Sequence, residues 1–192
     1  AYRQTHERLA SLDEALGREG GASAASPWED VRDFFHYCDN YIDAVDRAAE
    51  RFAGTEQAQL TERARAALSQ RGYTLRFADT AEVRRLDDRV LTLSTRALPP
   101  TQRFQLLHQI ALLTQNDLLE ATLDLARFQT GTARSIAKIG LANYFAGAAL
   151  LPYQTFLAAA RTTRHDLERL SDLFGASIEQ VAHRLSTLQR PG

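Results

Sequence analysis

The sequence contains no methionine, one lysine, one cysteine and one tryptophan in 192 residues. The single Cys38 excludes an internal disulfide and a metal site built from several cysteines within this chain, and we expect it to be a core thiol. Because methionine is absent even from position 1, we expect the chain to be a segment of a longer protein. No apolar run approaches the roughly 18 residues of a membrane-spanning helix, and the first residues are polar, so we expect a cytoplasmic protein without membrane contact.

Charge of either sign is not in excess, since 23 basic residues face 24 acidic ones and the net charge is −1. Binding to a phosphate backbone depends on accumulated positive charge, so this chain has no general field with which to hold nucleic acid. Apolar residues make up 44% and charged residues 24%, which are ordinary proportions for a folded domain. We therefore expect a globular chain that binds DNA poorly by itself.

The amino-terminal third shows helical patterns. Leucines at helical spacing in residues 2–16, followed by a stretch rich in Gly, Ala and Ser, predict a connector helix and linker over residues 1–25. The segment Ser26-Pro27-Trp28-Glu29 combines a capping serine, a proline at the first helical position and an acid three residues after the cap. This arrangement predicts the start of one long helix, whose apolar stripe continues at spacings of three and four to Phe52.

The pattern changes in the middle of the chain. A helix is expected over about residues 56–70, ended by Gly72. Apolar and polar residues then alternate, which predicts short strands between residues 73 and 95 with a turn near Asp87-Asp88. After two prolines, the spacing of apolar residues predicts a helix over residues 101–113.

The last third is helical from about residue 116, with breaks near residues 130–131, at Pro152 and at Gly175, so at least four helices are expected. Strand patterns occur only between residues 73 and 95. The expected fold class is therefore α+β and predominantly helical, with a small β-sheet and an N-terminal helical extension.

Residues 90–113 predict a strand, a turn and a helix with a histidine in its middle, which resembles the zinc-binding helix of zincin metallopeptidases. A working zinc peptidase needs two histidines four residues apart on that helix and a glutamate beside the first as general base. Those positions hold His108, Gln109 and Leu112. Gln109 cannot accept a proton as a carboxylate does, and Leu112 has no lone pair for a metal. We expect no catalytic residue and no metal ligand set.

A second motif, ANYFAGAALLP at residues 142–152, is similar to the downstream signature of the IrrE-like peptidase family. The resemblance implies that active members of that family have a glutamate as third zinc ligand three residues before the Ala-Asn pair. This chain has Ile139 at that position. The two motifs together indicate a degenerate zincin-like (IrrE-like) part over residues 73–192, preceded by a helical part over residues 26–72.

The amino-terminal segment SPWEDVRDFFHYCDNYIDAVDRAAE, followed by this degenerate part, is similar to the short-chain fatty-acyl transcriptional regulator family, which includes actinobacterial regulators of propionate and glyoxylate metabolism. The resemblance implies that residues 26–192 form an effector-sensing domain, joined by residues 1–25 to a helix-turn-helix domain that binds DNA. It also implies a carboxy-terminal cysteine-rich module with an iron-sulfur cluster. With Cys38 alone, this chain cannot carry such a cluster, and we expect no cofactor within it.

The resemblance further implies that the former peptidase cleft binds a short-chain acyl-coenzyme A, such as propionyl-coenzyme A, as effector. Coenzyme A carries phosphates, an adenine and a long pantetheine arm, so its site needs arginines, an aromatic platform and a narrow apolar tunnel. The candidate ligand-binding residues are Arg76, Arg96, Arg103, His108, Gln109, Arg134, Lys138, Asn143 and Tyr144.

Each candidate also has a structural interpretation. An arginine can solvate a surface, His108 can be a core histidine bonded to backbone, Tyr144 can be a core residue, and Asn143 can cap a loop. The small residues between Gly140 and Ala148 either leave room for an acyl chain or allow close helix packing.

Three other functions remain open at this point. The first is an active metallopeptidase. The second is direct DNA binding by residues 165–188, which have the helix, glycine turn and helix spacing of a helix-turn-helix. The third is a dimerisation module without a ligand, in which the apolar stripe from Trp28 to Phe52 joins two copies in a homodimer.

Overall fold

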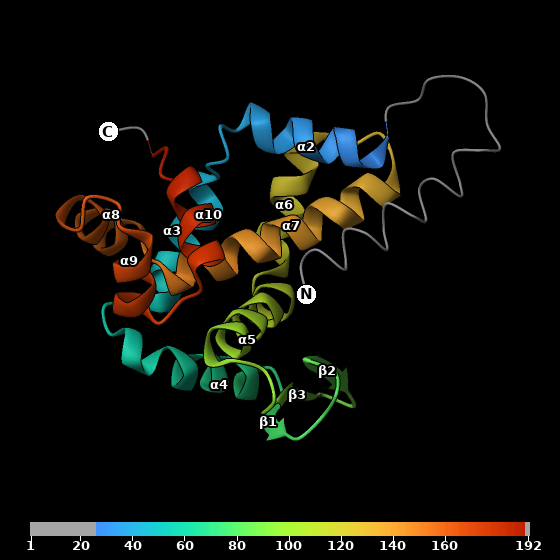
Figure 1. Cartoon of the computed structure of the whole chain (residues 1–192). Helices are drawn as coiled ribbons and strands as arrows, with labels where there is room; N and C mark the ends of the chain where they lie inside the picture. The colour runs from blue at the N-terminus through green and yellow to red at the C-terminus, as the bar shows by residue number, and fades with distance from the viewer. Residues whose placement is uncertain (1–25, 191–192) are drawn as a thin grey trace.

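The structure, a computed structural model, describes residues 26–190, and the predicted connector helix and linker lie outside the described residues. The helices are α2 (Pro27–Tyr37), α3 (Asp43–Ala53), α4 (Leu60–Gln70), α5 (Pro99–Thr114), α6 (Asn116–Ala126), α7 (Gly131–Leu150), α8 (Tyr153–Thr162), α9 (Leu167–Phe174) and α10 (Ile178–Ser186), with a 3₁₀ turn η1 (Gln57–Gln59) (Figure 1). The strands are β1 (Thr74–Ala78), β2 (Arg84–Asp87) and β3 (Val90–Ser94). The predicted fold class, α+β and predominantly helical with a small sheet, is confirmed.

The strands form one sheet in the order β1-β3-β2, in which β1 runs parallel to β3 and β2 runs antiparallel to it. A two-residue turn joins β2 to β3. Its residues Asp88 and Arg89 have φ values of 44° and 63°, the left-handed conformation that tight hairpins require. One face of the sheet carries Leu75, Leu91 and Leu93, which are buried because the sheet lies against α4 and α5.

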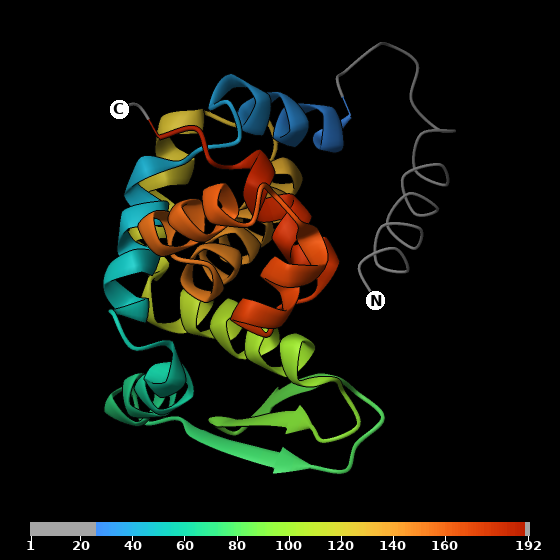
Figure 2. The ribbon, with the colours of Figure 1, turned by 60° about the vertical axis from the view of Figure 1, so that its left-hand side comes forward.

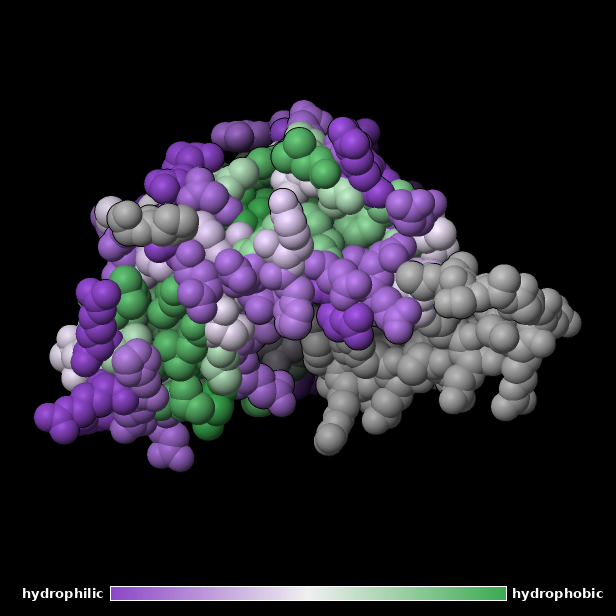
Figure 3. All heavy atoms as spheres, turned by 90° about the horizontal axis from the view of Figure 1, so that it is seen from above, coloured by the Kyte–Doolittle hydropathy of each residue, from purple (hydrophilic) through white to green (hydrophobic). Residues whose placement is uncertain are grey.

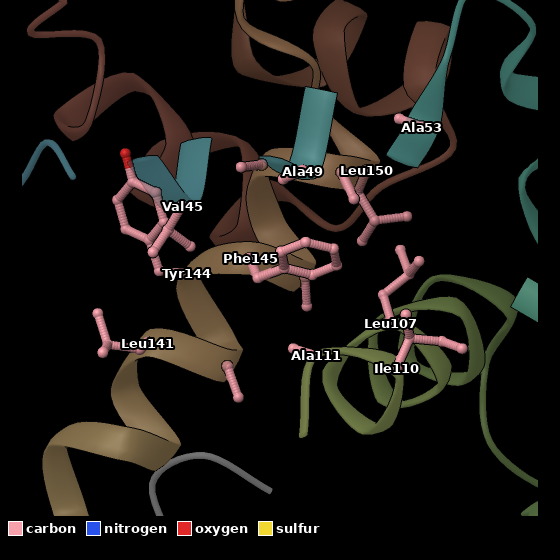
Figure 4. Packing of buried hydrophobic residues seen from close by; sticks show 14 of the residues in the cluster. Val45, Ala49, Ala53, Leu107, Ile110, Ala111, Leu141, Tyr144, Phe145 and Leu150 are labelled. Carbon is pink, nitrogen blue, oxygen red and sulfur yellow. The ribbon is translucent and has the colours of Figure 1, made fainter. Parts of the chain in front are cut away.

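The core is organised around α7, which contacts α2, α3, α5 and α6. Figure 4 shows Phe145 of α7 between Ala49 of α3 and Ala111 of α5, and all three residues are fully buried. The small sheet and α2 lie at opposite ends of the molecule (Figure 2). The sheet contacts α4 and α5, and α5 in turn packs on α7, so α5 connects the sheet with the rest of the core.

The prediction of one long helix from Ser26 is wrong, because α2 and α3 are separate helices. Asp39 and Asn40 have φ values of 50° and 56°, which no helix continues. Asp and Asn adopt this left-handed conformation more readily than most residues, so the break had a sequence signal. The predicted start of α2 is confirmed, since the Glu29 carboxylate accepts a hydrogen bond from the Ser26 N–H at 3.0 Å. Cys38, in the break, is half-buried against the core, and burial raises the pKa of its thiol.

A buried ionic cluster joins α3 to the carboxy-terminal end of the described chain. Asp46 of α3 is fully buried and accepts hydrogen bonds from Arg184 at 2.6 Å and from Arg190 at 2.9 Å. Arg190 also bonds Glu50 at 2.7 Å, and its guanidinium lies 4.1 Å from the ring centroid of Tyr153. Because each of these charges faces an opposite charge, the cluster fixes the end of the chain on α3.

None of the helices within residues 26–190 is both long and apolar enough to cross a membrane.

Candidate functional site

His108 lies in the middle of α5, is 4% exposed, and places its Nδ1 2.8 Å from Oδ1 of Asn143 on α7. Because an amide oxygen only accepts hydrogen bonds, Nδ1 carries the proton and donates, and Nε2 keeps its lone pair as an acceptor. Two of the candidate residues are therefore in contact. The partner of His108 is a side chain of the neighbouring helix and not the backbone.

The surroundings keep His108 neutral. Burial lowers the pKa of His108 to about 4, and the positive charge of Arg84 acts in the same direction, while the Asn143 hydrogen bond opposes both. At neutral pH the imidazole is thus uncharged and offers one donor and one acceptor, which suits recognition of a polar group better than proton transfer.

Arg84 is a part of this site that the sequence reasoning missed. It pairs with Leu93 across the β2–β3 hairpin, so its side chain projects from the same face of the sheet as the fully buried Leu93, toward α5. Its Nη1 is buried without a hydrogen-bond partner, and burial lowers the pKa of Arg84. The signal was the alternation of Arg84 with Leu86, which puts an arginine on the apolar face of an edge strand.

Arg103 lies near the start of α5 and donates from Nη2 to the Gly175 carbonyl, while its Nε is buried without a partner. It borders a shallow depression, open to solvent, whose other lining residues are Leu60, Thr61, Leu106 and Leu107 and which encloses no space for even a water molecule. Pockets for small molecules usually enclose roughly 300–1,000 Å³. This depression therefore does not hold a coenzyme A molecule in the arrangement described.

Zinc does not fit the positions that correspond to a zincin site. Leu112 occupies the place of the second histidine, Gln109 that of the general base, and Ile139 that of the glutamate ligand. Gln109 is 6% exposed and Ile139 is 48% exposed, and neither side chain carries a charge. Within the described residues, no three His, Cys, Asp or Glu side chains form a group that could hold a metal ion. The described residues support no zinc-dependent step.

Four of the predicted cations lie away from His108. Arg76 projects from the face of β1 opposite to the buried Leu75 and is exposed, and Arg96 pairs with the exposed Asp79. Arg134 and Lys138 of α7 turn toward α6. There Lys138 bonds Glu120 at 2.6 Å and Asn116 at 2.7 Å.

Arg134 pairs with Asp124 of α6 at 2.8 Å and also with Glu120. The charges of Arg134 and Lys138 are thus already balanced by carboxylates, which would compete with a phosphate for them.

Tyr144 follows Asn143 in the sequence but points to the other side of α7. Its hydroxyl donates to Asp46 at 2.9 Å and accepts from the Ile42 N–H at 3.2 Å, and the residue is 5% exposed. Burial raises the pKa of Tyr144 far above its usual value. Tyr144 connects α7 to α3, whereas Asn143 connects α7 to α5.

Two of the three glycines of α7, Gly140 and Gly147, have different surroundings. A Cβ atom at Gly140 would lie 2.9 Å from the Phe35 ring of α2, so this glycine permits close helix packing. A Cβ atom at Gly147 would meet no atom within 4 Å. Gly147 is one helical turn beyond Asn143, so the open space adjoins the Asn143 face of α7.

The two glycines should therefore respond in opposite ways to alanine. We expect Gly147→Ala to raise the free energy of unfolding by about 0.5–1 kcal/mol, because alanine favours the helix and fills open space. We expect Gly140→Ala to lower it by about 1–3 kcal/mol, because Phe35 must shift. Urea denaturation followed by circular dichroism measures both. Changes of the same sign would contradict the packing described for α2 and α7.

Comparison with known proteins agrees with this geometry. The family model of the IrrE N-terminal-like domain matches residues 65–186, which is more than half of the chain. The chain belongs to the IrrE N-terminal-like domain family. Over its whole length the chain with this IrrE-like domain is 71% identical to the propionyl-CoA carboxylase regulator of Cereibacter sphaeroides.

Two further relatives come from Mycobacterium tuberculosis. The HTH-type transcriptional regulator PrpR is 39% identical over 97% of the chain, and the HTH-type transcriptional regulator RamB is 37% identical over 99%. A solved structure described as a Mycobacterium tuberculosis transcriptional regulator superposes with a TM-score of 0.81 at 39% identity, covering 87% of this chain and 53% of the other. The chain spans 42% of the length of the three curated relatives.

These findings confirm the resemblance on which the sequence analysis relied. The IrrE-like fold is present, and the relatives named here are transcription regulators, although the family model is that of a peptidase family. Gln109, Leu112 and Ile139 stand where a zinc peptidase has its general base and two of its ligands, which agrees with relatives that are named as regulators.

Proposed function

We propose that this chain is the effector-sensing part of a longer transcription regulator and binds a short-chain acyl-coenzyme A of the propionyl-coenzyme A type. The observation that carries the proposal is the contact of His108 with Asn143, next to the uncompensated Arg84, in a scaffold without a peptidase ligand set. The name of the 71% identical relative, a propionyl-CoA carboxylase regulator, supports the choice of ligand.

The chemistry of the His108 site matches parts of such a ligand. The pantetheine arm presents two amides and a thioester carbonyl. His108 Nε2 accepts from an N–H group, the Asn143 amide nitrogen donates to a carbonyl oxygen, and Arg84 attracts a negative charge. The open space beside Gly147 is the place where a ligand gains access to these groups without displacing a side chain.

Ligand binding must also change the domain for it to act as a sensor. The depression beside Arg103 encloses no space for a ligand of this size, so binding requires a wider arrangement of the elements around α5. A ligand that binds only the wider arrangement shifts the population toward it. In the full-length protein this shift would control a helix-turn-helix domain preceding the chain, in the cytoplasm. Any iron-sulfur cluster would belong to a module outside this chain.

The geometry weakens two alternatives. Direct DNA binding by α9 and α10 would use Gln180, His183 and Arg184 to contact bases. Arg184 is 2% exposed and is paired with Asp46, and the Gln180 side chain bonds the Ser177 N–H at 2.9 Å. Of the three side chains, only His183 is exposed and without such a contact, and one side chain reads little sequence.

Dimerisation by the apolar stripe from Trp28 to Phe52 is weakened as well. Val45 and Ala49 in that stripe are fully buried within the chain, where α3 packs on α7. On the face shown in Figure 3, apolar surface gathers in two areas with a band of polar side chains between them. That face does not present one continuous apolar area of the kind that obligate dimers bury.

The proposal predicts a large thermal shift. Propionyl-coenzyme A at 100 times its dissociation constant should stabilise the chain by about 2.7 kcal/mol, which corresponds to a rise of about 5–10 °C in the melting temperature. Differential scanning fluorimetry measures the shift and titration calorimetry the affinity, with propionate alone as the control. No heat and no shift at millimolar propionyl-coenzyme A would refute the proposal.

The same chain should not act as a peptidase. Metal analysis of purified protein is expected to find no stoichiometric zinc, and peptide substrates should stay intact in the presence of added zinc. Zinc-dependent cleavage would refute the assignment as a sensor.

A further inference from the structure

Arg84 differs from the cations of the described chain that lie against an opposite charge. Arg184 and Arg190 face Asp46, and Lys138 faces Glu120. Arg103 also lacks a carboxylate, but its guanidinium donates to the Gly175 carbonyl. Arg84 has no such carboxylate among residues 26–190, and its Nη1 is both buried and without a hydrogen-bond acceptor. A buried guanidinium without an opposite charge is unfavourable, so the site gains free energy when an anion reaches it.

The location of Arg84 connects it with the His108 site. Register places its side chain on the α5 side of the sheet, because its partner Leu93 is fully buried there. Its charge acts on His108, whose imidazole contacts Asn143. The strand β2 is at the edge of the sheet, so one side of Arg84 has no further strand beside it.

We propose that Arg84 binds a compact oxyanion, a carboxylate or a phosphate, next to His108. The inference deepens the proposed function, since it assigns the group that recognises negative charge on the effector. A guanidinium donates two parallel hydrogen bonds to a carboxylate or phosphate, which gives this contact both strength and direction. The hydrogen bond from His108 also fixes the amide of Asn143 beside the anion.

The chain offers a matched control for Arg84. Arg85 is the next residue on β2, is exposed on the opposite face, and pairs with Asp87 at 2.6 Å. Arg84→Gln removes the charge but keeps a polar side chain, Arg84→Lys keeps the charge, and Arg85→Gln removes the same charge from the outer face. The probes are inorganic pyrophosphate, propionyl-coenzyme A and succinyl-coenzyme A, titrated by calorimetry against each variant.

We expect Arg84→Gln to weaken binding of the anionic probes at least tenfold, Arg84→Lys to recover part of it, and Arg85→Gln to change it less than twofold. If the oxyanion is a carboxylate at the end of the acyl chain, the wild type binds succinyl-coenzyme A more tightly than propionyl-coenzyme A, and Arg84→Gln removes the difference. If it is a phosphate of the coenzyme, Arg84→Gln weakens both equally and pyrophosphate competes with both.

Without ligand, Arg84→Gln should melt at the wild-type temperature or above it, because the variant removes an unpaired buried charge. A lower melting temperature together with unchanged affinities would show that Arg84 is structural, and would overturn the inference. Equal affinities of the wild type and Arg84→Gln for every probe would overturn it while leaving the proposed function intact. Binding of pyrophosphate that depends on Arg84, without binding of either acyl-coenzyme A, would refute the proposed function alone. No binding of any probe would refute both.

Discussion

Replacing Asp46 with alanine is expected to lower the free energy of unfolding by about 3–5 kcal/mol. Asp46 is fully buried and accepts from Arg184, Arg190 and the Tyr144 hydroxyl. Alanine leaves Arg184, itself 2% exposed, with a buried charge that no carboxylate balances. The loss arises from that uncompensated charge and the four broken hydrogen bonds, more than from lost packing.

Urea denaturation at pH 7 measures this loss, with Asp33→Ala as the matched control. Asp33 forms an ion pair with Arg32, and its side chain is 67% exposed, so its removal should change stability by less than about 0.5 kcal/mol. A loss near 1 kcal/mol for Asp46→Ala would mean that water or another carboxylate reaches the two arginines, and would contradict the buried cluster.

Acid is expected to destabilise the chain through His108. Its pKa is about 4 in the folded protein and 6.5 when unperturbed, so the unfolded chain takes up a proton at a higher pH than the folded chain does. Below pH 6.5 each fall in pH therefore favours the unfolded state, until the folded protein is also protonated near pH 4. A shift of this size corresponds to a loss of about 3 kcal/mol across that window.

His108→Gln isolates this contribution. Glutamine donates to Asn143 as the histidine does, yet it does not titrate. The difference in the free energy of unfolding between the two proteins should therefore change by about 3 kcal/mol from pH 7 to pH 4. Carboxylates such as Glu120, whose pKa is lowered by Lys138 and Arg134, contribute equally to both proteins and cancel. A difference independent of pH would show that His108 is protonated or solvated in the folded state.

Local signals in the sequence were sufficient for most elements. The prolines that begin α5, the alternation in β1 and β3, and the glycine after α9 each act over a few residues, and the structure has the corresponding elements. The break between α2 and α3 was missed because the apolar spacing continues through Asp39 and Asn40, whereas the backbone reverses there. Helical periodicity reports on which residues are buried, and it does not distinguish one helix from two that share a core.

The site was harder to predict than the fold. His108 and Asn143 were both named from motifs, but their contact depends on how α5 and α7 pack, which a single sequence does not specify. Arg84 escaped notice because its environment depends on strand register and on the depth of the sheet against α5. The same limitation applied to Arg134 and Lys138, whose carboxylate partners come from a different helix.

The close contact of Gly140 with the Phe35 ring has a mechanical consequence. Gly140 and Asn143 are three residues apart on α7, and a helix moves over that length as a stiff rod. A displacement of Asn143 would thus be transmitted to α2, since the space between Gly140 and the Phe35 ring is too narrow for even one further carbon atom. Movement of α7 where Asn143 contacts His108 would therefore displace α2, the helix that follows the predicted connector.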